Sequence, residues 1–251
     1  MKPAFLPKTL SIALVALAHL AAHAEGAAPH WAYAGHEGPA HWSELAPGFE
    51  ACASGHRQSP INIDRTVKTA LPALEFRYAS AAPTLVNNGH TIQVNLPPGQ
   101  MLSVGGVSYE LLQFHFHTPS EESIRGRRAA MVAHFVHKAA DGSLGVVAVL
   151  IQQGKPTAAF EPLFRHLPRE GETVTVAGLA LDLAGMLPAD LGYYDFDGSL
   201  TTPPCSEGVH WMVLKTPVTV GRRQIDAFHH LFRSNARPLQ QANERVVKES
   251  M

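Results

Sequence analysis

The segment Gln113-Phe114-His115-Phe116-His117 ends a run that begins at Leu111 and has the composition of a β-strand. Residues two apart in a strand project from the same face, so His115 and His117 are expected to lie side by side. Two imidazole rings in this arrangement can bind one metal ion. The segment therefore predicts both a strand and half of a metal site.

Further segments of similar character lie on both sides of this one, separated by Gly, Pro, Asn and Asp. They predict strands of one extended sheet at Thr91–Leu96, Leu111–His117, Met131–His137, Leu144–Ile151, Thr173–Val176 and Val209–Leu214. Helical periodicity is scarce, and it predicts two helices, at Ala158–Leu167 and Gly221–Ser234.

The strand expected at Met131–His137 supplies two more histidines, His134 and His137. Their spacing of three places them on opposite faces, so only one can join the first pair. Three neutral nitrogens with an open fourth position characterise a catalytic zinc site, whereas a structural site has four protein ligands, commonly sulfur. A bare His-x-His in a chain with 15 histidines also fits ordinary, half-buried strand histidines.

The N-terminus has the pattern of a signal peptide. Lys2 and Lys8 precede or flank an apolar stretch, and Ala22-His23-Ala24 matches a cleavage site. We expect residues 1–24 to be removed and residues 25–251 to form one catalytic domain in the periplasm or outside the cell, without a membrane span. A core helix is the alternative interpretation of residues 9–22.

Charge and cysteine content restrict the class of binding partner and the cellular compartment that we expect. The formal net charge is −1, and loss of Lys2 and Lys8 makes it −3, which argues against nucleic acid as a partner. In an oxidising compartment, Cys52 and Cys205 are expected to form a disulfide worth roughly 5 kcal/mol on the chain-entropy model. Two free thiols, or one metal-binding cysteine, are the alternatives.

Six motifs occur together in one order. They are Trp31-x-Tyr33, Gly38-Pro39-x-His41-Trp42, Gln58-Ser59-Pro60-Ile61-Asn62-Ile63, Asn87-Asn88-Gly89-His90, Gln113 to His117, and Gly198-Ser199-Leu200-Thr201-Thr202-Pro203-Pro204. From about Trp31 to Pro238 the chain resembles the alpha-class carbonic anhydrases, particularly the secreted bacterial ones. The resemblance implies an α+β, predominantly β, single domain with a large twisted, mostly antiparallel central sheet and short peripheral helices.

The resemblance also implies the role of each site residue. His115, His117 and His134 would bind Zn2+, and a zinc hydroxide, oriented by Thr201 and Glu121, would act as nucleophile. His90 would be the proton shuttle. The remaining matches are the substrate-binding Val136, Val146, Leu200, Thr202 and Trp211, the solvent-organising Tyr33, Asn88 and Gln93, and the disulfide of Cys52 and Cys205.

The match departs from the family around the third ligand. Gln113 and a backbone carbonyl near Asn235 fit as acceptors for His115 and His117. For His134 the family usually has a glutamate two residues before the ligand, where this chain has Val132, and it has a histidine where this chain has Glu122. This reciprocal change suggests the hypothesis that Glu122 supplies the missing carboxylate from the other strand.

The implied function is the zinc-dependent, reversible hydration of carbon dioxide to bicarbonate and a proton. The resemblance further implies a small-molecule substrate (carbon dioxide or bicarbonate) and inhibition by sulfonamides and anions, and it leaves a homodimer open. Two alternatives are a catalytically weakened carbonic-anhydrase-like binding protein and a zinc hydrolase acting on another carbonyl substrate. The zinc hydrolase would require neither His90 nor the apolar residues Val136, Val146, Leu200 and Trp211.

Overall fold

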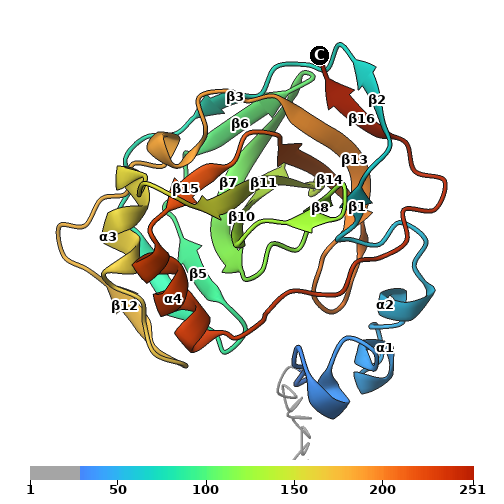
Figure 1. Cartoon of the computed structure of the whole chain (residues 1–251), viewed down its shortest axis with the longest axis horizontal. Helices are drawn as coiled ribbons and strands as arrows, with labels where there is room; N and C mark the ends of the chain where they lie inside the picture. The colour runs from blue at the N-terminus through green and yellow to red at the C-terminus, as the bar shows by residue number, and fades with distance from the viewer. Residues whose placement is uncertain (1–28) are drawn as a thin grey trace, which may run out of the picture.

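A large mixed β-sheet dominates the computed structural model, which describes residues 29–251 (Figure 1). The expected signal peptide at residues 1–24 lies outside the described residues. In chain order the strands of this sheet are β2 (Thr66–Thr69), β3 (Glu75–Arg77), β4 (Thr84–Asn87), β5 (Ile92–Asn95), β6 (Met101–Val104), β7 (Val107–His117), β10 (Met131–Ala139), β11 (Leu144–Gln153), β12 (Thr173–Thr175), β13 (Tyr193–Ser199), β14 (Glu207–Leu214), β15 (Val218–Val220) and β16 (Val247–Ser250).

The sheet is mostly antiparallel, as predicted. Its main path runs β12-β4-β5-β7-β10-β11-β14-β13-β16-β2, with β6 added to β7, β3 to β6 and β15 to β11. Among the described residues, the parallel pairings of this sheet are β11 with β14, β11 with β15, and β16 with β2. The six strands predicted from the sequence all belong to this sheet, with ends that shift by at most a few residues.

The helices are short and lie around the sheet (Figure 1). They are the α-helices α1 (Trp42–Leu45), α2 (Ala51–Ser54), α3 (Glu161–Phe164) and α4 (Arg222–Leu231), and the 3-10 helices η1 (Gly35–Glu37), η2 (Ala158–Phe160) and η3 (Ala184–Met186). The helix predicted at Ala158–Leu167 forms as η2 followed by α3 and ends at Phe164; Leu167, directly before Pro168, is biased away from helical geometry. In residues 29–251, no helix has the length and hydropathy needed to cross a membrane.

Side-chain alternation gives the central strands two different faces. Phe114 and Phe116 of β7 and Phe135 of β10 are fully buried in the larger core cluster, where the Phe114 and Phe135 rings stack with centroids 4.8 Å apart. The opposite face of β7 and β10 carries His115 and His134, which are direct partners in the register of the two strands. The same pattern that builds the core therefore directs the histidines to one side.

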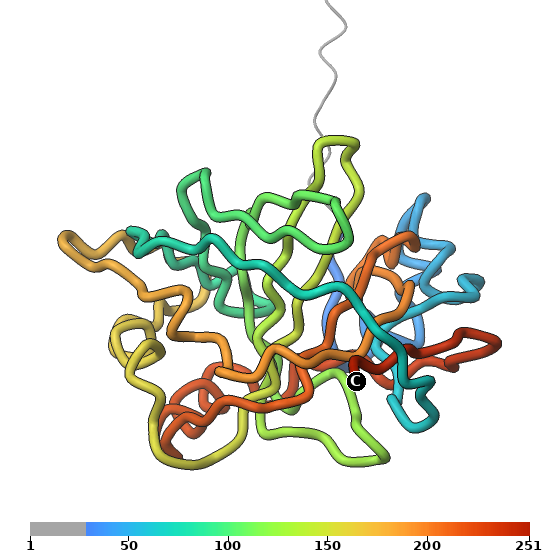
Figure 2. The backbone as a smooth tube through the Cα atoms, turned by 90° about the horizontal axis from the view of Figure 1, so that it is seen from above, coloured from blue at the N-terminus to red at the C-terminus, as the bar shows by residue number. Residues whose placement is uncertain are grey.

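A second, three-stranded sheet joins β1 (Asn62–Ile63), β8 (Ser123–Ile124) and β9 (Arg127–Arg128). The β8–β9 hairpin ends in the exposed basic run that begins at Arg125. Nearby, the disulfide Cys52–Cys205 is present, with a Cα–Cα distance of 5.0 Å. In Figure 2 the blue N-terminal segment lies beside the orange segment that follows β13, and the disulfide joins these two segments.

Candidate metal centre

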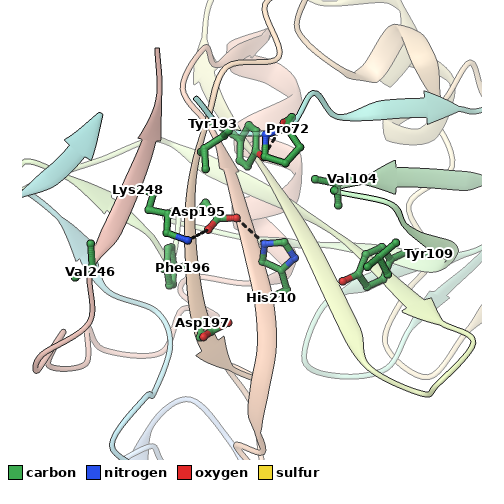
Figure 3. A pocket seen from close by; sticks show the side chains of 13 residues that line it. Pro72, Val104, Tyr109, Tyr193, Asp195, Phe196, Asp197, His210, Val246 and Lys248 are labelled. Atoms are coloured by element: carbon green, nitrogen blue, oxygen red, sulfur yellow. Dashed lines mark hydrogen bonds and ion pairs between the residues drawn. The ribbon is translucent and has the colours of Figure 1, made fainter. Parts of the chain in front are cut away.

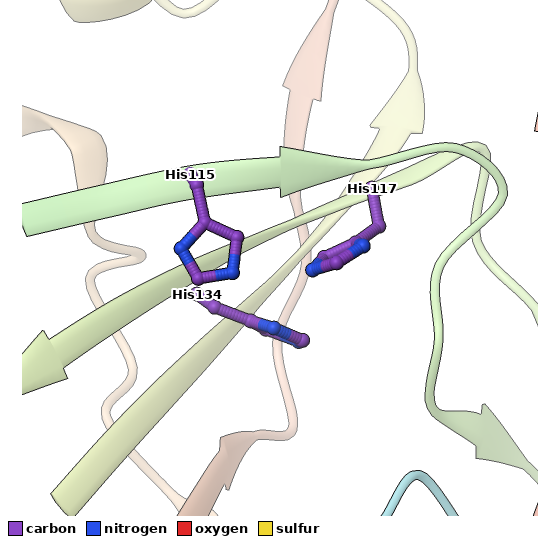
Figure 4. Close-up of side chains that lie close together, drawn as sticks. All are labelled: His115, His117 and His134. Carbon is purple, nitrogen blue, oxygen red and sulfur yellow. The ribbon is translucent and has the colours of Figure 1, made fainter. Parts of the chain in front are cut away.

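Three histidines from two adjacent strands point into one space (Figure 4). His115 and His117 lie on β7, and His134 lies opposite His115 on β10. One potential ligand atom from each ring lies within 4.8 Å of the others. His117 and His134 are each only 1 % exposed, and His115 is half-buried.

His137 does not join this group. Its ring is fully buried on the other face of β10, where it contacts the Tyr78 hydroxyl and lies 3.3 Å from the Gly145 carbonyl oxygen. Strand spacing left open which of the two β10 histidines meets the pair on β7, whereas the family resemblance indicated His134, and the structure brings His134 there.

Each histidine of the group donates one ring N–H to an oxygen acceptor, which leaves its other nitrogen free. Such bonds fix the tautomer and the orientation of a metal ligand. The free nitrogens are Nε2 of His115, Nε2 of His117 and Nδ1 of His134. The donor to acceptor distances are His115 Nδ1 to Gln113 Oε1 2.9 Å, His117 Nδ1 to the Asn235 carbonyl oxygen 2.7 Å, and His134 Nε2 to Glu122 Oε1 2.9 Å.

The acceptor for His134 comes from the turn after β7. Glu122 is 1 % exposed, so its carboxylate reaches the ring inside the protein. Val132, two residues before His134 on β10, is fully buried in an apolar cluster and offers no polar atom. The carboxylate beside the third histidine is therefore Glu122, on a different segment from the one the family pattern uses.

Burial keeps the β7 histidines neutral. It lowers the pKa of His115 to about 3 and the pKa of His117 well below its usual value. Burial also acts to lower the pKa of His134, but the adjacent Glu122 and Glu121 carboxylates outweigh it, and the net pKa is raised. Neutral imidazole is the form that binds a metal ion.

Within the described part of the chain, three buried polar atoms at this site have no hydrogen-bond partner: His117 Nε2, Glu121 Oε2 and Glu122 Oε2. Buried polar groups are rarely left unpaired, so they indicate a missing partner. A divalent cation would bind the free nitrogen of His117 and offset the two adjacent carboxylates. Three histidine nitrogens match the ligand set of catalytic zinc, so the residues present fit a zinc ion.

Glu121 and Thr201 lie together beside this group. Glu121 is fully buried, its Oε1 accepts the Arg237 backbone N–H at 2.7 Å, and its Oε2 lies 3.5 Å from His117 Nε2. Burial raises the pKa of Glu121 to about 7, against the opposing effects of His134, the Thr201 hydroxyl and the Arg237 amide. Thr201, 6 % exposed, is in the loop after β13.

An apolar surface borders the site across three strands. Val136, Val146 and Trp211 occupy aligned positions on β10, β11 and β14, and the Trp211 ring packs edge-on to His134 with centroids 4.9 Å apart. Leu200 packs against the same cluster. Half-buried Thr202 follows Thr201 in the loop.

His90 lies in the turn before β5. Its half-buried ring stacks on Trp31 with centroids 3.7 Å apart and an interplanar angle of 8°. Burial and the neighbouring His30 lower the pKa of His90. The ring lines a cleft of about 540 Å3 together with Tyr33 and Asn88.

Two residues expected to organise solvent are engaged in protein contacts. Asn88 Oδ1 accepts the backbone N–H groups of His90 and Thr91, both at 3.0 Å, so this oxygen shapes the turn. Gln93 Nε2 donates to Asn95 Oδ1 at 2.7 Å. The side-chain NH2 of Asn88 and the amide oxygen of Gln93 remain for solvent.

A separate cleft of about 610 Å3 contains another histidine–carboxylate pair (Figure 3). His210 Nε2 donates to Asp195 Oδ2 at 2.6 Å, and Lys248 Nζ lies 3.9 Å from the other carboxylate oxygen. His210 precedes Trp211 on β14, so it faces away from the metal centre. Within residues 29–251, the three-histidine group is the one cluster of three or more potential ligands.

The sequence reasoning missed Arg237 and gave Gln58 no role. Arg237 is 1 % exposed, its backbone contacts Glu121, and its guanidinium donates to Gln58 Oε1 at 2.9 Å. Nothing near Arg237 in the sequence marks it as buried, because its partners come from distant segments. The motif that begins at Gln58 marked this residue as part of the family pattern, but the motif alone does not reveal its contact with Arg237.

Comparisons with known proteins agree with this geometry. Residues 37–251 match the protein family described as eukaryotic-type carbonic anhydrase. A carbonic anhydrase of Pectobacterium carotovorum is 40% identical over 242 residues (95% of this chain, 98% of the relative), and one of Neisseria gonorrhoeae is 43% identical over 249 residues (98% of each). The solved structure of an alpha-carbonic anhydrase from Thermovibrio ammonificans with the inhibitor sulfanilamide superposes with a TM-score of 0.86 at 39% identity, covering 88% of this chain and 100% of that one.

Proposed function

The chain belongs to the eukaryotic-type, or alpha-class, carbonic anhydrase family, and we propose that it catalyses the zinc-dependent, reversible hydration of carbon dioxide to bicarbonate and a proton. One observation carries this proposal: three histidine nitrogens converge, each ring oriented by its own acceptor. A site with three nitrogen ligands leaves a fourth position for water.

His115 Nε2, His117 Nε2 and His134 Nδ1 would hold the zinc ion. When bound, zinc supplies a Lewis acid that lowers the pKa of water to about 7, the value known for the carbonic anhydrases, so that hydroxide is available near neutrality. The carboxylate of Glu122 raises the basicity of His134 and holds its ring in place.

Thr201 and Glu121 orient the nucleophile. In this proposal the Thr201 hydroxyl donates a hydrogen bond to the Glu121 carboxylate, so its lone pairs face the metal centre and accept a hydrogen bond from the attacking oxygen. A lone pair of that oxygen is then directed at the substrate carbon. The Arg237 backbone N–H holds Glu121 Oε1, which limits the positions that the carboxylate can take.

The apolar surface receives carbon dioxide. Val136, Val146, Leu200 and Trp211 form one wall, against which an uncharged, linear molecule can rest without displacing strongly bound water. Thr202, next to Thr201, would donate a hydrogen bond to the bicarbonate product.

His90 moves the proton to solvent. An unperturbed imidazole titrates near neutrality, so it can accept a proton from water in the cleft and release it. The lowered pKa of His90 favours release. Tyr33, Asn88 and Gln93 would hold the water molecules through which the proton passes.

We also propose export to the periplasm or the cell exterior, followed by removal of residues 1–24. The disulfide Cys52–Cys205 supports an oxidising compartment. Because a related enzyme has been crystallised with sulfanilamide, we expect sulfonamides to inhibit this one, and small anions to compete for the same position.

The proposal is tested by measuring zinc content and stopped-flow carbon dioxide hydration on the purified chain, with and without sulfanilamide. We expect one zinc per chain and hydration that the inhibitor abolishes. His115→Asn, which removes one ligand, should lose both zinc and activity. Stoichiometric zinc in the parent with hydration no faster than buffer would refute the proposal and favour a binding protein on the same scaffold.

A further inference from the structure

Arg237 carries a fully buried positive charge that the proposed mechanism does not use. Among the described residues no carboxylate lies within ion-pairing distance of its guanidinium, which is held by neutral oxygens. Nη1 donates to Gln58 Oε1 at 2.9 Å and to the Ser59 carbonyl at 2.8 Å, and Nη2 donates to the Cys52 carbonyl at 2.9 Å. The guanidinium also lies over the Trp42 ring, 5.6 Å from its centroid.

Burial of the Arg237 guanidinium is unfavourable unless its lost solvation is replaced. Burying a charge costs several kcal/mol unless hydrogen bonds and aromatic contacts offset the lost solvation. The planar fork of arginine can bind several acceptors at fixed angles, which a lysine cannot do. A side chain that only filled space could be apolar, so the three acceptors indicate that the fork fixes the position of the segments it contacts.

The acceptors belong to the N-terminal arm, which we define as residues 49–59. Its fold brings the Gln58 side chain against Gly55, where any Cβ atom would collide with the Gln58 amide. Gln58 Nε2 donates onward to the Cys205 carbonyl at 3.0 Å. Arg237 is thus connected to Cys205 in two ways: through Gln58, and through Cys52 and the disulfide.

Cys205 belongs to the loop that carries Thr201. Its backbone N–H donates to the Thr202 carbonyl at 2.8 Å, which closes a tight turn directly after Thr201. At the other end of the connection, the Arg237 backbone N–H holds Glu121 Oε1 at 2.7 Å. One residue therefore links both members of the Thr201–Glu121 pair to the same buried arm.

We propose that Arg237 is a positioning residue for the reaction, which sets the spacing of Glu121 and Thr201 through two parallel connections to Cys205. This inference rests on the proposed function, because the pair matters only if it orients the nucleophile. Misplacing a catalytic group by about 1 Å can cost on the order of 100-fold in rate, so small movements of the arm are sufficient.

The parallel connections make a specific prediction. Cys52→Ala/Cys205→Ala removes the covalent connection and keeps the Gln58 bridge, whereas Gln58→Met removes the bridge and keeps the disulfide. We expect each change alone to lower kcat less than about threefold, and the combination to lower it more than about tenfold, because each connection substitutes for the other. KM and zinc affinity should stay close to the parent values.

Arg237 itself is tested by Arg237→Lys and Arg237→Met. Both should lower kcat by about tenfold or more, with full zinc occupancy, and Lys should retain more activity because it keeps the charge. Arg245→Lys is the matched control: Arg245 also donates to backbone carbonyls, but they are those of Asp197, Gln241 and Ala242, outside the N-terminal arm, and its kcat should be unchanged.

All variants are compared by stopped-flow hydration at a temperature where circular dichroism shows them folded. Parental kcat in folded Arg237→Met overturns the proposal. If that variant does not fold, the Gln58 and disulfide cycle decides, and effects that multiply independently overturn the proposal. A zinc-loaded parent without hydration activity would instead refute the proposed function, so the two failures are distinguishable.

Discussion

The Glu122 carboxylate should control how tightly the site holds zinc. Glu122→Ala removes a charge-assisted hydrogen bond of 2.9 Å and leaves the His134 N–H unpaired in a fully buried position. Hydrogen bonds with one ionised partner contribute about 1.5–3 kcal/mol. Because about 1.4 kcal/mol corresponds to a tenfold change, the zinc dissociation constant should rise about 10- to 100-fold. Glu122→Gln keeps an acceptor but loses the charge, so its effect should be about tenfold or less.

The assay is competition for zinc against a chelator of known affinity. The double variant Glu122→His/Val132→Glu puts the carboxylate back on β10, and it should bind zinc more tightly than Glu122→Ala. Glu110→Gln is the control, because its carboxylate lies on β7 and accepts the Gly99 N–H at an exposed turn that contains none of the three histidines. Zinc affinity equal to that of the parent in both Glu122→Ala and Glu122→Gln would refute the reasoning.

Three more predictions follow from the structure. His90→Ala should lower turnover several-fold in weak buffer and much less in concentrated imidazole, which accepts the proton instead; equal losses in both would exclude a shuttle. Cys52→Ala/Cys205→Ala should lower the free energy of unfolding by about 2–5 kcal/mol in urea titrations, and an unchanged midpoint would contradict this. Burial lowers the pKa of His137 to about 4, so the folded state resists protonation more than the unfolded state, whose value is near 6.5. The free energy of unfolding should therefore be unaffected by His137 above pH 6.5 and should fall by on the order of 3 kcal/mol between pH 6.5 and 4. His137→Phe should reduce this fall if His137 causes it.

The sequence predicted the parts of the fold that repeat along the chain. Alternation in Leu111–His117 and Met131–His137 gave the two central strands and the shared face of His115 and His117. The structure extends these strands to Val107 and Ala139. Strands such as β13 (Tyr193–Ser199) were missed because Gly198 and three polar residues interrupt their pattern.

The sequence predicted less of the metal site than of the fold. Position alone excluded either His134 or His137, the family resemblance indicated His134, and the register of β7 and β10 places His134 opposite His115. The reciprocal change at Val132 and Glu122 could be noticed only against a family pattern. Arg237 could not be found at all, because its burial depends on contacts with residues about 180 positions earlier in the chain. Periodicity reports which face a residue occupies, whereas a network of this kind is set by tertiary packing.

X-ray diffraction from zinc-loaded crystals, measured on both sides of the zinc absorption edge, tests the central claim most directly. The account predicts one strong anomalous peak bound by His115 Nε2, His117 Nε2 and His134 Nδ1, with solvent as the fourth ligand. A peak elsewhere, a fourth protein ligand, or no peak in metal-saturated crystals would contradict it.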